Sequence, residues 1–100
     1  MYASVSTFPI LPGQLDEAIR IHGEVLPLVM QLPGIQSDVL LVDRSANTIV
    51  TIATYDTEEH AQVIPSGALR EAMAGLSAVL SGRPDRKWYE VVTVTPAEVK

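Results

Sequence analysis

The chain alternates between two hydrophobic periodicities, and this alternation is the feature that most limits its fold. Segments rich in strand-forming residues alternate with segments whose apolar residues recur every three or four positions, and prolines and glycines separate them. The predicted strands are residues 2–8, 35–43, 48–55 and 87–95, and the predicted helices are residues 14–32, 56–63 and 66–80. The order is β-α-β-β-α-β, with the second helical stretch in two parts. It predicts a ferredoxin-like α+β fold, with a four-stranded antiparallel sheet covered by helices on one face.

Proline and acidic residues mark several of the helix ends. The first helical segment ends at Pro33-Gly34. Asp56, followed three residues later by Glu59, has the spacing of a helix cap. Pro27 lies inside the first helical segment and has no N–H, so the Gly23 carbonyl loses its usual partner. We therefore expect a kink at this point of the helix.

The predicted strands are apolar on both faces. In an antiparallel sheet with one face in water, apolar and polar residues should alternate. The last three strands instead set Val39 and Leu41 against Leu40 and Val42, Ile49 and Ala53 against Val50 and Ile52, and Trp88, Val92 and Val94 against Tyr89 and Val91. The helices can cover only one face, so we expect a second copy of the chain to cover the other in a homodimer. The alternative is that these residues serve only as good strand formers.

Length, charge and composition exclude several classes of protein. A chain of 100 residues predicts one domain, residues 1–100. Its net charge of -5 would repel a nucleic-acid backbone or an anionic membrane surface, so neither is an expected partner. It has no cysteine and only two histidines, far apart in sequence, so no metal site is expected. No apolar run is long enough to span a bilayer and no secretory signal is visible, which predicts a cytoplasmic protein.

Three segments of the chain resemble a known family. They are Glu24-Val25-Leu26-Pro27 running to Leu32-Pro33-Gly34-Ile35, the hairpin segment Leu40-Leu41-Val42-Asp43-Arg44, and the junction Thr54-Tyr55-Asp56-Thr57-Glu58-Glu59. They look like the dimeric α/β-barrel superfamily, and are most similar to its small antibiotic-biosynthesis-monooxygenase members. The resemblance implies a homodimer whose sheets meet back to back, with an apolar cavity in each subunit between sheet and helices. Members of the family include oxygenases of polycyclic aromatic substrates that need no cofactor, haem-degrading enzymes, and proteins without an assigned activity.

The functional residues of that family are only partly matched. Its oxygenases and haem-degrading members place an Asn on the first strand, where this chain offers only Ser4, Ser6 and Thr7. They place a Trp at the end of the third strand, where this chain has Tyr55. The His of the haem-degrading members falls in the region of Ile64-Pro65, and His60 comes too early. The resemblance therefore implies the dimer and the cavity rather than one particular reaction.

His22 is the first predicted catalytic residue. It falls within the apolar stripe of the first helix, so it should face the sheet, where it needs a hydrogen-bond partner. It could be a base or orient a substrate oxygen, or it could be a core histidine with a structural role. Burial disfavours its charged form unless a carboxylate lies close by. Asp38, on the second strand, is the one acid that could face it.

Tyr55 is the second predicted catalytic residue, as a hydrogen-bond donor to a developing oxyanion. The other predicted cavity or ligand-binding residues are Ser4, Ser6, His60, Met73 and Trp88. Each of these also has a plainer alternative: the two serines could simply make room for a helix, His60 could lie in solvent, and Met73 and Trp88 could be packing residues. Trp88 and Tyr89 are adjacent and should point to opposite faces of the last strand.

The remaining charged residues give no further site. Five of them are expected to be solvated turn charges: Asp43, Arg44, Asp85, Arg86 and Lys87.

Two classes of function stay open at this stage. One is a small oxygenase that acts on an aromatic or polyketide-like substrate without metal, flavin or other cofactor, and uses His22 and Tyr55. The other is a non-catalytic binding or structural protein that holds a small apolar or aromatic ligand in the same cavity, and the missing Asn and Trp favour it. A haem-binding protein is a third alternative.

Overall fold

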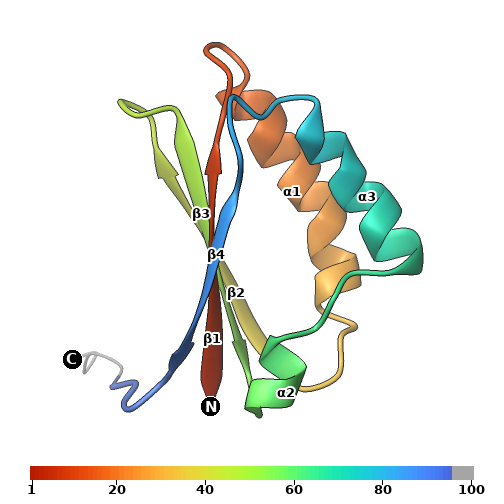
Figure 1. Ribbon diagram of the computed structural model, residues 1–100, viewed down its shortest axis with the longest axis vertical. Helices are drawn as coiled ribbons and strands as arrows, with labels where there is room; N and C mark the ends of the chain where they lie inside the picture. Colours follow the sequence, from red (N-terminus) through yellow and green to blue (C-terminus); the bar gives the residue numbers. More distant parts are fainter. Residues whose placement is uncertain (96–100) are drawn as a thin grey trace, which may run out of the picture.

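Two helices lie on one face of a four-stranded antiparallel sheet in the computed structural model, which describes residues 1–95 (Figure 1). The elements are β1 (Tyr2–Pro9), α1 (Leu15–Val29), β2 (Ile35–Asp43), β3 (Thr48–Tyr55), α2 (Glu58–Ala61), α3 (Gly67–Ser77) and β4 (Asp85–Glu90). The strand order across the sheet is β2-β3-β1-β4, so the first and third strands are central. The predicted β-α-β-β-α-β order and ferredoxin-like α+β fold are confirmed.

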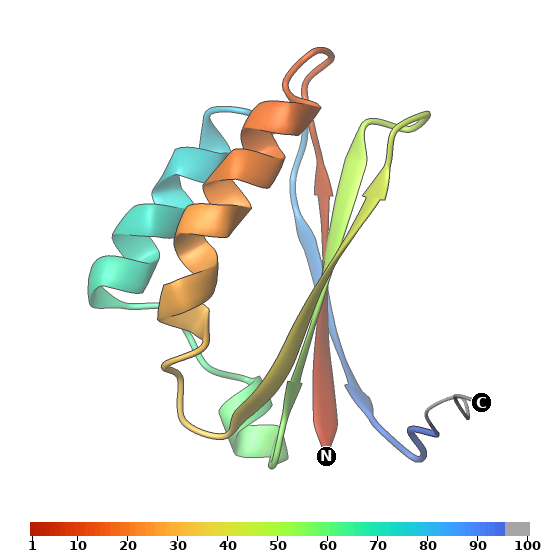
Figure 2. The same cartoon turned by 180° about the vertical axis from the view of Figure 1, so that it is seen from behind.

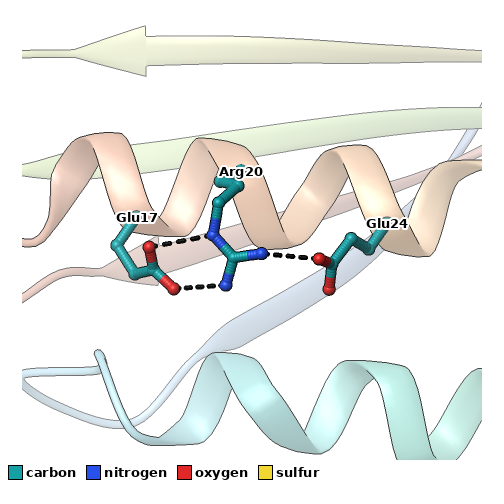
Figure 3. A network of polar contacts seen from close by, with 3 residues as sticks. All are labelled: Glu17, Arg20 and Glu24. Carbon is teal, nitrogen blue, oxygen red and sulfur yellow. Dashed lines mark hydrogen bonds and ion pairs between the residues drawn. The ribbon is translucent and has the colours of Figure 1, made fainter.

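The core lies between α1, α3 and the helix-facing side of the sheet. Ala18 and Ile21 of α1 are buried, together with Leu69 of α3 and Ile49 of β3. The opposite side of α1 is in solvent, where Arg20 bridges two carboxylates one turn away on either side (Figure 3). Such exposed ion pairs contribute little to stability. The helix is therefore held in place by its apolar stripe.

All three helices are shorter than predicted, and α3 ends at Ser77 rather than at residue 80. α1 runs through Pro27 and ends at Val29, so the proline is accommodated inside its last turn. The predicted Asp56 cap of α2 is wrong by one residue: Thr57 is the cap, and its hydroxyl accepts a hydrogen bond from the His60 backbone N–H at 3.2 Å. Asp56 instead accepts from the ring of His60, at 2.6 Å from Nδ1. The Asp56 carboxylate, which the pattern predicted as the cap, is instead hydrogen-bonded to the His60 side chain.

The last strand begins and ends earlier than predicted. Its hydrogen-bonding partner is β1, whose first residue, Tyr2, pairs with Glu90. Beyond that pair, one more backbone hydrogen bond joins the two segments: the Val91 N–H donates to the carbonyl of Met1, the residue before β1, at 2.9 Å. The predicted continuation to residue 95 is therefore wrong, because β1 offers no partner there, and Val92 is exposed.

The face of the sheet that points away from the helices is apolar. The register places Val39 beside Ile52 and Leu41 beside Val50 on this face, while Leu40 and Val42 point to the helices. The predicted separation of the two pairs onto opposite faces is confirmed. No described element covers it, as the view from behind shows (Figure 2). Leu41 is 47% exposed in the single chain. The homodimer that would bury this face stays a prediction.

Gly34, between α1 and β2, is needed for two reasons. Its φ is +75°, in the left-handed region, and a β-carbon there would overlap the Asp56 carboxylate and the His60 ring. Its carbonyl accepts the Asp56 N–H at 2.9 Å, so this glycine joins the start of β2 to the end of β3. The Asp56–His60 pair therefore packs directly against the backbone of Gly34.

We predict that Gly34→Ala destabilises the protein more than Gly13→Ala does. Gly13 has a similar φ of +79°, but a β-carbon there meets no atom within 4 Å. The control should lose only the backbone cost of a left-handed alanine, about 1–2 kcal/mol. Gly34→Ala should lose that and also displace the Asp56–His60 pair. Urea unfolding of the two variants gives the comparison, and equal losses would contradict the close contact.

Candidate functional site

An apolar cavity of about 330 Å³ lies between the sheet and the two long helices. The helices contribute apolar side chains, among them Val25 and Val29 of α1 and Leu69 and Met73 of α3. The sheet contributes the helix-facing residues of all four strands. A volume of this size is at the lower end of the range for small-molecule sites, about 300–1,000 Å³.

Short side chains on the two central strands account for the cavity. Ser4 of β1 pairs with Ala53 of β3, and Ser6 pairs with Thr51, and all four line the cavity. Protein interiors are otherwise close-packed, so four short residues in the middle of the sheet leave space that the helices do not fill. Ser4 and Ser6 thus lie where the sequence predicted, on the cavity wall.

His22 and Asp38 form a hydrogen-bonded pair on the cavity wall. The two atoms, His22 Nε2 and Asp38 Oδ1, are 3.1 Å apart, and the side chains are 14% and 5% exposed. An ionised carboxylate only accepts hydrogen bonds, so in the neutral imidazole the proton is on Nε2 and the lone pair is on Nδ1. The expectation that Asp38 would face His22 is confirmed. The buried carboxylate thus holds the imidazole in one tautomer.

Tyr55 is buried at the end of β3 and also lines the cavity. Burial raises the pKa of its phenol, the positive charge of Arg86 lowers that pKa, and the negative charge of Asp38 raises it again. Tyr55 is therefore within electrostatic reach of both charged groups. Because its pKa is raised overall, the phenol stays protonated near neutral pH and can donate a hydrogen bond.

Arg86 is the site residue that the sequence analysis missed. The expectation that it is a solvated turn charge is wrong: it lies on β4, lines the cavity, and burial lowers the pKa of its guanidinium. Its Nε donates to the Ser4 hydroxyl at 2.9 Å. The sequence does indicate this position, because Arg86 and Trp88 are two residues apart and must share a face of the strand. Placing the start of the strand at residue 87 concealed it.

Two of the predicted site residues lie outside the cavity lining. Trp88 is on the helix-facing side of β4, but its indole N–H donates to the Ala61 carbonyl at 2.9 Å and its ring lies under Arg86. His60 pairs with Asp56 at the surface. Met73, in contrast, lines the cavity with His22 and Tyr55.

The part of the chain that the structure describes has neither a metal-binding cluster nor a membrane-spanning helix. Within residues 1–95 no group of three or more His, Cys, Asp or Glu side chains comes together to hold a metal ion. None of the helices in that range is long and apolar enough to cross a membrane.

Comparison with solved structures relates this fold to known proteins. A crystal structure of an antibiotic biosynthesis monooxygenase is 15% identical, covers 93% of this chain and 100% of its own, and gives a TM-score of 0.78. The chain has the fold of the antibiotic biosynthesis monooxygenases. This confirms, for the fold, the resemblance drawn from the sequence. At such identity the likeness is one of fold alone.

Two other structures place the same fold in different contexts. A mutant of SnoaB, a cofactor-independent oxygenase from Streptomyces nogalater, is 18% identical, with 96% of this chain and 97% of that one covered and a TM-score of 0.76. A protein of unknown function from Nitrosomonas europaea is 21% identical, with 97% and 95% covered and a TM-score of 0.79. No family model matches the sequence, and no curated protein matches it.

We predict that Tyr55 gives the last phenol to ionise in a pH titration. Burial raises its pKa above the ordinary value of 10.0. The unfolded chain therefore ionises first, and the stability that this phenol contributes is lost as the pH rises from 10.0 through the folded pKa. Ultraviolet absorbance of the phenolates measures the transition, and Tyr55→Phe should remove its highest step. Tyr89→Phe, on the opposite face of the sheet, should leave that step in place; the reverse result would contradict the buried position of Tyr55.

Proposed function

We propose that this protein is a small oxygenase that acts without a cofactor on an aromatic or polyketide-like substrate bound in the cavity. The observation that carries the proposal is the His22–Asp38 pair, a base in a fixed tautomer on the wall of a mostly apolar cavity. The name of SnoaB, a cofactor-independent oxygenase with this fold, supports the same reaction class.

The proposed chemistry asks little of the protein beyond a base, an orienting donor and the exclusion of water. Nδ1 of His22 takes a proton from an acidic C–H of the substrate, and Asp38 stabilises the imidazolium that forms. The Tyr55 phenol donates a hydrogen bond to the oxygen on which negative charge develops. The substrate carbanion supplies the electrons that reduce O₂. One oxygen atom becomes a carbonyl in place of the CH₂ group, and the other leaves as water with the two hydrogens.

We predict that the protein consumes O₂ with a member of a panel of anthrones, whose ring CH₂ supplies the acidic C–H, and that His22→Gln slows this turnover about 10²–10⁴-fold, the usual contribution of a general base. Asp38→Asn should slow it as well, because an amide no longer favours the imidazolium. His60→Gln removes the other histidine, which lies outside the cavity, and should leave turnover unchanged.

An oxygen electrode measures the rates, and native mass spectrometry reports bound ligand. Turnover that is equal in the parent and in His22→Gln would contradict the role of His22. A ligand that is recovered unchanged after incubation in air, with no O₂ uptake by the parent, would favour the alternative of a non-catalytic binding protein.

The apolar face of the sheet supports the further proposal of a homodimer. A solvent-exposed apolar row on β2 and β3 is costly in a single chain, and a second copy would remove it from water. The cavity is on the other face of the sheet, so each subunit would keep its own site.

We predict that Leu41→Lys converts the protein from a dimer to a monomer, because it places a charge in the middle of the buried face. Light scattering should give about twice the 10.8 kDa chain mass for the parent and the chain mass for the variant. Met30→Lys is a matched control, since Met30 is 46% exposed but lies at the end of α1. A parent that scatters as a monomer, or two variants that behave alike, would contradict the proposal.

A further inference from the structure

Arg86 is a partly buried cation without a counter-charge in the described chain. In residues 1–95 no carboxylate lies within ion-pair distance of Arg86, whereas Arg20, Arg44 and Lys87 each have one. Arg70 and Arg83 have no such partner there either, but both are exposed, while Arg86 is half-buried. Two carboxylates line the cavity, and each has another partner: Asp38 is paired with His22, and Asp85 lies 3.9 Å from the ammonium of Lys87. Burying a charge without an opposite charge is unfavourable, so this arrangement calls for an explanation.

The acceptors that do hold Arg86 are all neutral. Nε donates to the Ser4 hydroxyl at 2.9 Å. Nη1 donates to the Val63 carbonyl and Nη2 to the Ala61 carbonyl, each at 3.1 Å. A guanidinium has five N–H bonds, so one N–H on each terminal nitrogen has no acceptor within the described residues. The charge is solvated by the protein, but it is not neutralised.

The guanidinium is also fixed in orientation. It donates its three hydrogen bonds to acceptors on β1, on α2 and on the segment that follows α2. The centre of the Trp88 ring lies 5.1 Å from its Cζ. A planar fork that is held in this way loses little further freedom when it binds a planar anion. Arg86 is the one permanent cation among the residues that line the cavity in residues 1–95.

We propose that the cavity binds its ligand through an ionised carboxylate that accepts the two remaining N–H bonds of Arg86, so that the ligand is an aromatic carboxylic acid with its apolar body against α1 and α3. The proposal deepens the proposed function by naming the acidic group of the substrate, and it rests on that function only in assuming that the cavity takes a ligand. Arg86 offers one positive charge, and Asp38 and Asp85 already place negative charge in the lining, so the site accommodates a carboxylate monoanion better than a phosphate dianion.

Arg86 also has a structural role, because it ties β4 to α2 and to the segment after it. The first measurement therefore uses the unaltered protein. It compares 2-naphthoate with 2-naphthamide, which has the same bicyclic body and no charge, by calorimetric titration. The carboxylate should bind at least about tenfold more tightly, the usual gain from hydrogen bonds to a charged group. In ¹⁵N-labelled protein the Arg86 Nε–H resonance should move with naphthoate and not with naphthamide.

The variants then assign this preference to one residue. Arg86→Gln should bring the affinity ratio to about one, since the amide side chain keeps a hydrogen-bond donor but loses the charge. Arg44→Gln, at an exposed arginine in the turn between β2 and β3, is the matched control and should keep the parent ratio. If Arg86→Gln does not fold, the ratio and the resonance shift in the parent decide.

Three results would overturn the proposal. Equal affinities for the two naphthalenes, or an Nε–H resonance that naphthoate does not move, would leave Arg86 as a structural clamp only. Tighter binding of 2-naphthyl phosphate than of 2-naphthoate would contradict the carboxylate. The two proposals fail separately: a preserved preference for naphthoate without O₂ uptake removes only the oxygenase, and O₂ uptake with neutral anthrones without that preference removes only the carboxylate site.

Discussion

The pairing of β1 with both β3 and β4 is the interaction on which the rest of the structure depends. It places Ser4 and Ser6 in the middle of the sheet, opposite the helices, and it sets Ser4 beside Ala53. Because these side chains are short, α1 and α3 pack against each other and against the ends of the sheet and leave a hollow between. The same pairing brings Arg86 next to Ser6, within reach of the Ser4 hydroxyl. Cavity and cation thus arise from one strand register.

Much of this could be predicted from the sequence, because it depends on local patterns. The spacing of apolar residues gave the order of elements, and the alternation on β2 gave the two faces of that strand. Even the His22–Asp38 pair was accessible, since a helix-facing histidine needs a partner and the chain offered one acid in the right place. These predictions need only the knowledge of which side of an element a residue is on.

What could not be predicted depends on contacts between distant segments. β4 ends where β1 stops offering partners, and nothing within residues 87–95 marks that point. Its start was misplaced for the same reason, so Arg86 was assigned to a turn. The capping acid of α2 was misassigned because Asp56 is engaged by His60, and Gly34 leaves room for that pair. Pairing with β1 thus sets the limits of β4, and the pair that Asp56 forms with His60 overrides its cap signal.

The polar groups of the cavity would orient a bound ligand, because they offer a hydrogen-bond acceptor at one place and donors at another. His22, with its lone pair on Nδ1, comes from α1, and Arg86, with two N–H bonds to spare, comes from β4. The two groups lie toward opposite edges of the sheet, because Arg86 is on the edge strand β4 and Asp38, the partner of His22, is on the other edge strand, β2. Tyr55, on β3, responds to the charges of both Arg86 and Asp38. A ligand whose acidic group sits on Arg86 would therefore lie across the central strands, with its other end toward the base. Such an orientation would select which C–H bond meets His22. Binding of the acidic group at Arg86 would therefore determine where the proposed chemistry takes place on the ligand.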